Sequence, residues 1–125
     1  PFGYGVSYTT FQYGDIVLNT PTMKQNETIT ATIQVTNSGK YDGAEVVQLY
    51  IRDLVGSITR PVRELKGFKK IFLKAGESKT VSFKITADLL RFYDYDLNQV
   101  TEPGEFDIFI GGSSQATKTA RLTLK

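Results

Sequence analysis

Alternation of apolar and polar side chains over residues 45–53 constrains the fold of this chain more than any other feature. Val47, Leu49 and Ile51 fall on one side of this stretch, and Gln48, Tyr50 and Arg52 fall on the other. Successive side chains of a strand point to opposite sides, so a period of two indicates a strand with one buried face.

A second apolar stretch, residues 60–73, also reads as a strand, but its alternation fails. Leu65 and Phe68 are an odd number of residues apart, so a regular strand would send them to opposite faces. A β-bulge at Gly67 is expected to bring both side chains to the core, because glycine tolerates the backbone of a bulge. Pro61 is typical of the start of an edge strand, where no ladder donor is lost.

The remaining strand signals are shorter and are separated by turn residues. Residues 11–19 should form a strand with a kink near Gly14, and residues 20–27 a turn. Further strands are expected at 28–36, 79–86, 106–110 and 117–124, with a short hairpin at 93–101. Residues 87–92 suggest one helical turn, with Thr86 as its cap and Leu89 and Phe92 plugging the core.

About seven strands without a long helix predict an all-β fold, an antiparallel β-sandwich of the immunoglobulin or fibronectin type III kind. A barrel is the alternative architecture. The 125 residues suffice for one domain. We expect the sandwich to span residues 11–125 and residues 1–10 to be an interdomain connector. The chain starts at Pro1 without a signal-peptide pattern, so we interpret it as a piece of a longer protein.

Composition excludes several kinds of chemistry. The chain has no cysteine and no histidine, which removes disulfides, thiolate chemistry, histidine-containing triads and histidine-based zinc sites. Fifteen basic and thirteen acidic residues give a net charge of +2, which provides no reason to expect nucleic acid as a partner. No apolar run is long enough to span a membrane.

Acidic residues offer two candidate sites, and both are weak. Four positions match a calcium-binding loop, but Gln99 stands where that loop requires glycine, and strands rather than helices flank it; the four are Asp94, Asp96, Asn98 and Glu105. Asp53 and Glu64 flank the central loop and could be a glycosidase pair, although spacing alone cannot place them across a substrate. We therefore predict no metal site, no cofactor and no catalytic residue in this chain.

Aromatic residues offer a third candidate site. The chain has seven tyrosines and eight phenylalanines, and those on outward or turn positions could stack on sugar rings. This alternative hypothesis, a carbohydrate-binding module, rests on Tyr41, Tyr50, Tyr93 and Tyr95. In a sandwich, such side chains more often pack across strands or fill the core.

Several longer motifs together resemble a known family. They are PFGYGVSYTTF at residues 1–11, VVQLYIRD ending at Asp53, RPVRELKGF at 60–68, LKAGE at 73–77, EPGEF at 102–106 and GGSS at 111–114. Over essentially the whole chain they resemble the C-terminal fibronectin type III-like domain of family 3 glycoside hydrolases, the β-glucosidases and β-xylosidases. No motif here matches the catalytic ones of that family.

The resemblance implies a non-catalytic accessory domain that stabilises a β-glycosidase through an interface and borders its substrate cleft. Its partners would be the catalytic barrel and α/β domains of the parent chain, and its location periplasmic or secreted in a bacterium. Aromatic residues and arginine are favoured at interfaces, which makes the N-terminal aromatics and the loop between Asp53 and Arg63 our expected contact surface. The candidate residues are Phe2, Tyr4, Tyr8, Arg52, Asp53, Arg60 and Arg63.

Overall fold

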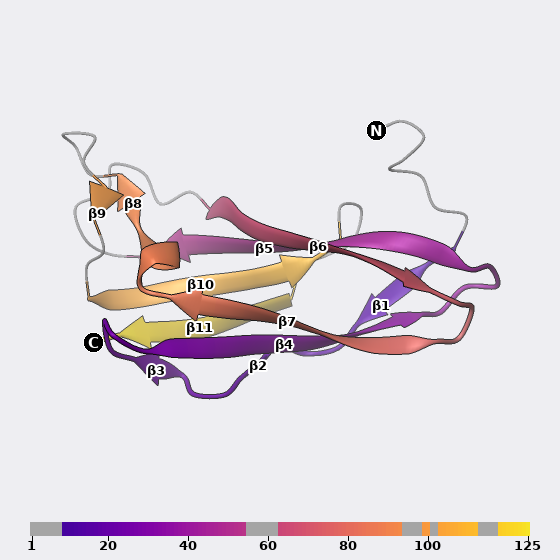
Figure 1. Cartoon of the computed structure of the whole chain (residues 1–125), viewed down its shortest axis with the longest axis horizontal. Helices are drawn as coiled ribbons and strands as arrows, with labels where there is room; N and C mark the ends of the chain where they lie inside the picture. The colour runs from indigo at the N-terminus through magenta and orange to yellow at the C-terminus, as the bar shows by residue number, and fades with distance from the viewer. Residues whose placement is uncertain (1–8, 55–62, 94–98, 101–102, 113–117) are drawn as a thin grey trace.

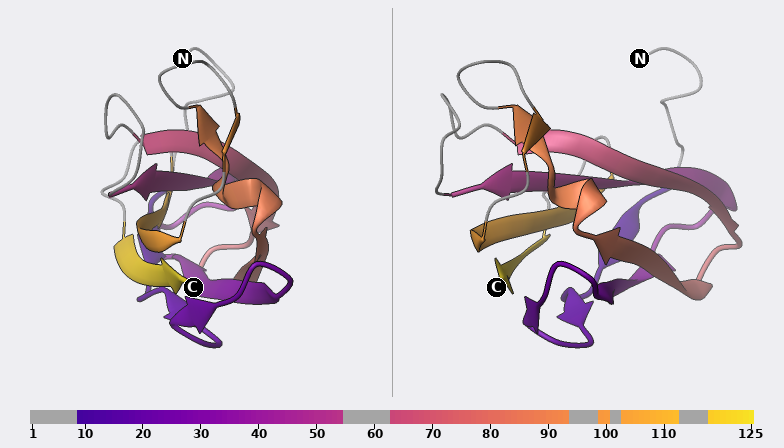
Figure 2. Two further views of the ribbon diagram at one scale, coloured as in Figure 1. Left: turned by 90° about the vertical axis from the view of Figure 1, so that its left-hand side faces the viewer. Right: turned by 60° about the vertical axis from the view of Figure 1, so that its left-hand side comes forward.

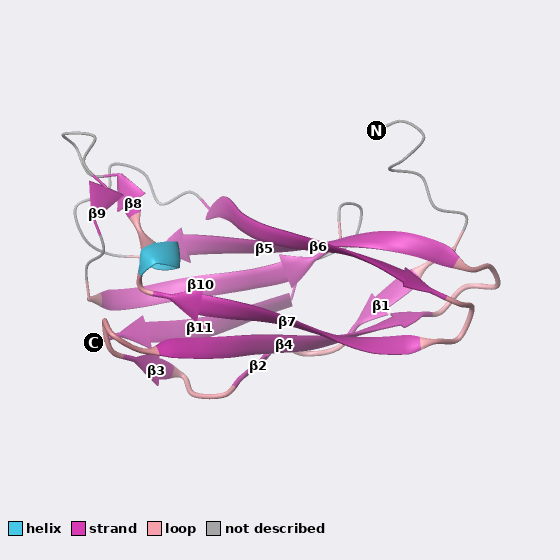
Figure 3. Ribbon diagram, viewed as in Figure 1, coloured by secondary structure: helices cyan, strands magenta, loops and turns pink. Residues whose placement is uncertain are grey.

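The computed structural model describes residues 9–54, 63–93, 99–100, 103–112 and 118–125. Two sheets of strands lie face to face (Figure 1), and the turned views show the two layers from other sides (Figure 2). Strands dominate the described residues, in which the helical element is one short turn (Figure 3). The predicted all-β sandwich is thus confirmed. Within the described residues no helix is long and apolar enough to cross a membrane.

The smaller sheet is built around one long strand, β4 (Thr28–Asn37). On one side β4 pairs antiparallel with β1 (Phe11–Tyr13) and then with β2 (Val17–Leu18), and on the other side with β7 (Ser78–Thr86). The predicted kink near Gly14 is seen as the break between β1 and β2. The 28–36 strand and the 79–86 strand are confirmed.

The larger sheet has five strands in the order β3-β11-β10-β5-β6. Their bounds are β3 (Thr22–Met23), β11 (Lys118–Leu124), β10 (Gly104–Gly111), β5 (Gly43–Asp53) and β6 (Arg63–Leu73). All pairs are antiparallel except β11 with β3. That short parallel pair was not predicted, because residues 20–27 read only as a turn. β6 lies at the edge of this sheet, as expected for a segment that starts near proline.

The core lies between the two sheets and is filled by the alternating residues of both. The inward positions of β5 and β10 are fully buried, as the period of two predicted; they are Val47, Leu49, Ile51, Phe106, Ile108 and Ile110. From the facing sheet they meet the buried side chains of Ile29, Ala31, Ile33, Val35, Val81, Phe83 and Ile85.

The bulge in β6 is present, but its expected consequence is wrong. The register shifts between Leu49, which pairs with Gly67, and Tyr50, which pairs with Leu65. The bulge does bring Leu65 and Phe68 to one face, yet that face is the outer one, and both side chains are exposed. Gly67 occupies the inward position, where an added Cβ would touch the Phe83 ring at 3.7 Å.

The connection from β7 to β10 also differs in detail from the prediction. The helical turn is a 3-10 helix, η2 (Asp88–Leu90), and the Thr86 hydroxyl accepts a hydrogen bond from the Leu89 N–H at 3.2 Å. Leu89 is partly buried and packs against the core as expected, and Leu90, which was not predicted, is fully buried. The predicted hairpin follows as β8 (Phe92–Tyr93) and β9 (Gln99–Val100), and the side chain of Phe92 lies outside the description.

Candidate domain interface

The outer face of the larger sheet carries apolar side chains that nothing in the described structure covers. We use "outer face" for the side of β5, β6 and β10 that points away from the core. Phe68, Phe72 and Leu65 on β6 keep 65, 58 and 49 % of their surface exposed. The register places Phe72 opposite Ala44 and Phe68 opposite Gln48, so these side chains follow one edge of the face. Exposed apolar patches on soluble domains mark interaction sites.

The corresponding face of the smaller sheet is polar, which makes the contrast informative. Its outward positions are Thr28, Thr30, Thr32, Gln34 and Thr36 on β4 and Ser78, Thr80, Ser82 and Lys84 on β7. Hydroxyl, amide and ammonium groups suit a face that remains in water. Among the described residues, the outer face of the smaller sheet thus carries one exposed large apolar side chain, Val17 of β2, whereas that of the larger sheet carries Leu65, Phe68 and Phe72.

A row of charged residues crosses the larger sheet at the end of the outer face. Arg63 of β6, Arg52 of β5, Asp107 of β10 and Arg121 of β11 are paired in register. Arg52 Nη2 donates to one oxygen of Asp107 at 2.9 Å, and Arg121 Nε donates to the other at 2.8 Å. Two guanidinium groups thus hold one carboxylate that is itself nearly buried.

The electrostatics of Asp107 reflect this geometry. Burial raises the pKa of a carboxyl group, but hydrogen bonds from Arg52 and Arg121, together with their positive charges, outweigh it and hold the pKa of Asp107 below its ordinary value. Arg121 also donates to Glu105 at 2.8 Å. The row is therefore a preformed, charged network, and its Arg52 Nε is buried without an acceptor among the described residues.

Two aromatic rings lie in the neighbouring row and contact the arginines. Tyr50 and Phe109 are paired across β5 and β10, and the Arg63 guanidinium carbon lies 5.0 Å from each ring centroid. Arg52 lies 5.5 Å from the Phe109 centroid. These are cation–π distances. Arginine stacked on aromatic rings at the edge of an apolar patch is the composition that dominates binding energy at protein interfaces.

The structure places three of the predicted interface residues. Arg52 and Arg63 lie on the outer face, whereas the Asp53 side chain is buried at the end of β5. Phe2, Tyr4, Tyr8 and Arg60 lie outside the described residues. Phe68, Phe72 and Phe109 were missed as site residues. Ile71, Phe72 and Leu73 are consecutive, and in any strand the middle one must point away from its neighbours, so Phe72 could have been found from the sequence.

The tyrosines of the sugar-binding alternative do not gather on one described surface. Tyr41 is exposed in the turn after β4, whereas Tyr50 is half-buried, donates its hydroxyl hydrogen to Gln48 at 3.3 Å and carries Arg63 against its ring. The Tyr93 side chain and all of Tyr95 lie outside the described part of the chain. A ring already in contact with a guanidinium offers less surface to a sugar.

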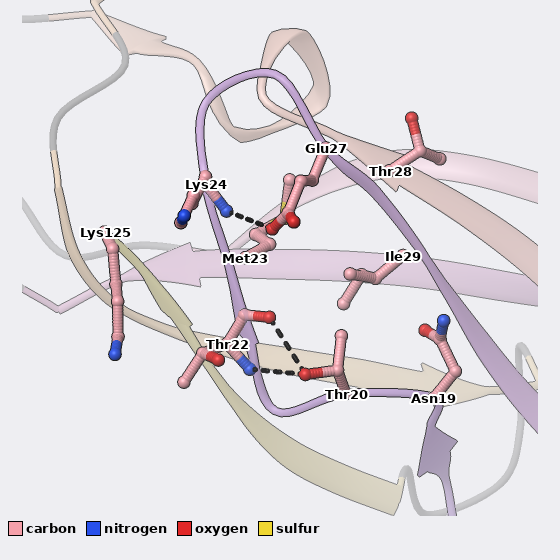
Figure 4. Close-up of a pocket in the computed structure, with 9 residues that line it drawn as sticks. All are labelled: Asn19, Thr20, Thr22, Met23, Lys24, Glu27, Thr28, Ile29 and Lys125. Carbon is pink, nitrogen blue, oxygen red and sulfur yellow. Dashed lines mark hydrogen bonds between the residues drawn. The ribbon is translucent and has the colours of Figure 1, made fainter.

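A shallow hollow of about 430 Å³ opens beside β3 and the start of β4 (Figure 4). No aromatic ring is among its lining residues, and several of its polar groups bond within the chain. The Thr20 hydroxyl bonds to the backbone of Thr22, and Glu27 accepts a hydrogen bond from the Lys24 N–H at 2.7 Å. This hollow therefore lacks the ring surface expected of a sugar site.

The two residues of the candidate acidic pair lie on neighbouring strands, because Glu64 pairs with Ile51, two residues before Asp53. Asp53 faces inward at the end of β5, whereas Glu64 lies in β6, 3.3 Å from the Lys66 ammonium. Glu105 pairs with Arg121. Asp94, Asp96 and Asn98 lie outside the described residues.

Comparison with known proteins gives consistent relatives. The fibronectin type III-like domain family matches residues 45–114. The chain is 48 % identical over 124 residues to a periplasmic β-glucosidase of Salmonella typhimurium, covering 99 % of this chain and 16 % of that protein. It is 51 % identical over 127 residues to a β-xylosidase of Formosa agariphila, covering 100 % of this chain and 18 % of that protein.

Solved structures show the same relation. A β-glucosidase from Erythrobacter marinus superposes with a TM-score of 0.88 at 38 % identity, over all of this chain and 17 % of that one. A β-glucosidase from Listeria innocua in complex with glucose superposes with a TM-score of 0.85 at 38 % identity, over 99 % of this chain and 17 % of that one. The chain therefore spans less than a fifth of the length of each of these four relatives.

Proposed function

The chain belongs to the fibronectin type III-like domain family, and from this premise we propose that it is a non-catalytic accessory domain of a β-glycosidase. Its relatives are β-glucosidases and a β-xylosidase, each several times longer than this chain. In this proposal the rest of the parent chain supplies the catalytic residues, and the domain stabilises that part through an interface. The periplasmic relative supports a periplasmic or secreted location.

The observation that carries the proposal is the outer face. Burying a phenylalanine completely contributes about 1.5–3 kcal/mol. Phe68 and Phe72 still expose 65 and 58 % of their surface, so covering each would add roughly 1–2 kcal/mol. The arginine–aromatic row beside them would add directional contacts at the edge. We propose that this face packs against the catalytic part of the parent chain.

The test uses the full-length parent protein and compares substitutions on and off the outer face. Phe68→Ser and Phe72→Ser should each lower the temperature at which glycosidase activity is lost, because an apolar contact is removed from the interface. Val17→Ser is the matched control, since Val17 is 60 % exposed but lies on β2 of the other sheet. Hydrolysis of a nitrophenyl glycoside after heating provides the measurement.

The proposed interface predicts two results. At moderate temperature, kcat/KM of the Phe68→Ser and Phe72→Ser proteins should equal that of the wild type, since these residues do not touch substrate in this proposal. Their inactivation temperatures should fall below that of Val17→Ser. If all three variants lose activity at the same temperature, the outer face is not the interface.

Titration with cello- or xylo-oligosaccharides, followed by tyrosine fluorescence, distinguishes the accessory domain from the carbohydrate-binding alternative. If the domain is purely structural, the titration should show no saturable change attributable to it. Tyr41 is the most exposed tyrosine among those described, and Tyr41→Ala is therefore the sharpest variant. Saturable binding that Tyr41→Ala abolishes would favour the module and would contradict a purely structural role.

A further inference from the structure

Asn37, the last residue of β4, is fully buried where several segments of the chain meet. Its carboxamide oxygen accepts hydrogen bonds from the Thr9 hydroxyl at 2.6 Å and from the Gly39 N–H at 3.0 Å. Its nitrogen donates to the carbonyl oxygens of Tyr41 at 2.8 Å and Leu73 at 3.0 Å. All hydrogen-bonding positions of a primary amide are thereby used. We call these five residues the Asn37 junction.

Backbone hydrogen bonds extend the junction to both neighbouring turns. The Asn37 N–H donates to the Glu77 carbonyl at 2.8 Å, and the Asn37 carbonyl accepts from the Gly76 N–H at 2.9 Å. The Ser38 N–H donates to the Thr10 carbonyl at 2.9 Å. Residues 9–10, which lead into β1, are therefore held by side chain and backbone together.

Gly39 shows how closely residues 9–10 are packed against the turn after β4. A Cβ at this position would overlap the Thr9 hydroxyl and approach the Thr10 nitrogen to 2.8 Å. Backbone atoms cannot yield as a flexible side chain can. Any larger residue at position 39 must therefore displace the segment that leads into β1.

The junction lies beside one end of the outer face. Leu73, whose carbonyl accepts from Asn37, directly follows Phe72 in β6. The first described residues lie at the same end of the sandwich as the end of β6 (Figure 1). The point at which the chain enters the sandwich is thus fixed relative to Phe72 by a short chain of hydrogen bonds.

We propose that Asn37 is a positioning residue, which sets the orientation of this domain on the rest of the parent chain. It does so by holding the segment that enters the sandwich in one place beside the outer face. This inference rests on the proposed function, because it assumes that the outer face packs on the rest of the parent chain.

The test measures orientation directly in the full-length parent protein. One spin label is placed on β7 at Lys84→Cys, an exposed position away from the outer face, and a second on the surface of the catalytic part of the parent chain. Pulsed electron paramagnetic resonance then gives the distribution of distances between them. Thr9→Val removes the hydroxyl and keeps the shape, Thr9→Ser keeps the hydroxyl, and Gly39→Ala displaces residues 9–10. Thr32→Val, on the polar face of β4, is the matched control.

We expect the wild type, Thr9→Ser and Thr32→Val to give one narrow distance distribution, and Thr9→Val and Gly39→Ala to broaden it about twofold or more. A narrow distribution in both Thr9→Val and Gly39→Ala would overturn the positioning role. Phe68→Ser separates this result from a failure of the proposed function. If Phe68→Ser broadens the distribution while the junction variants do not, the interface stands and the inference falls. If Phe68→Ser leaves it narrow, the interface is wrong.

Discussion

Substituting Tyr13 by phenylalanine should destabilise the fold, because it removes a buried hydrogen bond between the two sheets. The Tyr13 hydroxyl of β1 donates to Glu45 Oε2 of β5 at 2.9 Å, so the bond joins the two sheets. Both residues are buried. Leaving a buried acceptor without its donor costs about 1–3 kcal/mol, and we expect Tyr13→Phe to lower the free energy of unfolding by this amount.

The loss of unfolding free energy caused by Tyr13→Phe should depend on pH, and the environment of Glu45 determines the direction. Burial raises the pKa of Glu45 more than the hydrogen bonds from Tyr13 and from the Val46 backbone lower it. The contribution of Glu45 to stability is therefore complete below its unfolded pKa and is lost as pH rises through the folded pKa. Removing the Tyr13 hydroxyl takes away a group that favours the carboxylate, so Tyr13→Phe should cost more at about pH 8 than at about pH 4.

Urea denaturation followed by circular dichroism, from about pH 4 to about pH 8, measures both quantities. Tyr41→Phe is the matched control, because Tyr41 is exposed in a turn. Glu45→Gln should flatten the pH dependence, since the amide has no proton to lose. A Tyr13→Phe penalty below about 0.5 kcal/mol, or one that is equal at both ends of the pH range, would refute the account of this site.

Three further outcomes follow from the structure. Asn37→Ala should lower the free energy of unfolding by about 2–4 kcal/mol in urea denaturation, because several buried partners lose their bonds together. Asp107→Asn should cost about 1 kcal/mol or less near neutral pH, since its arginine partners are about half exposed. That cost should vanish in acid titrations, because a lowered pKa means the contribution is lost as pH falls through the folded value. Ile108→Ala should cost about 2–5 kcal/mol by the same denaturation assay.

Alternation predicted the buried faces well because a strand has only two sides. In β4, β5 and β10 the fully buried apolar side chains fall on one parity and pack against the facing sheet. Parity does not say which side of a strand is covered, however. Leu65 and Phe68 share a face as predicted, but their face is the outer one, because the inward positions of β6 hold Gly67, Lys69 and Ile71.

Other features depended on contacts distant in sequence. The β3–β11 pair spans two residues on each strand, which is too short for a periodic signal. Arg63 and Tyr50 were each singled out from the sequence for different functions. The antiparallel register of β5, β6 and β10 brings them together with Phe109, and no local pattern encodes that register across the long loop.

The edges of the sandwich indicate how the outer face can be used. β6 and β7 are both edge strands, and apolar edge strands tend to pair with other chains. Here Lys69 and Lys79 occupy inward-facing positions of these strands, opposite Val47 and Val35, and the Lys69 ammonium lies 5.5 Å from the Phe83 ring centroid. Inward-pointing lysines on an edge oppose strand addition. A partner of β6 is therefore expected to pack against its outward side chains and not to add a strand to its edge. Another domain of the parent chain would pack in this way.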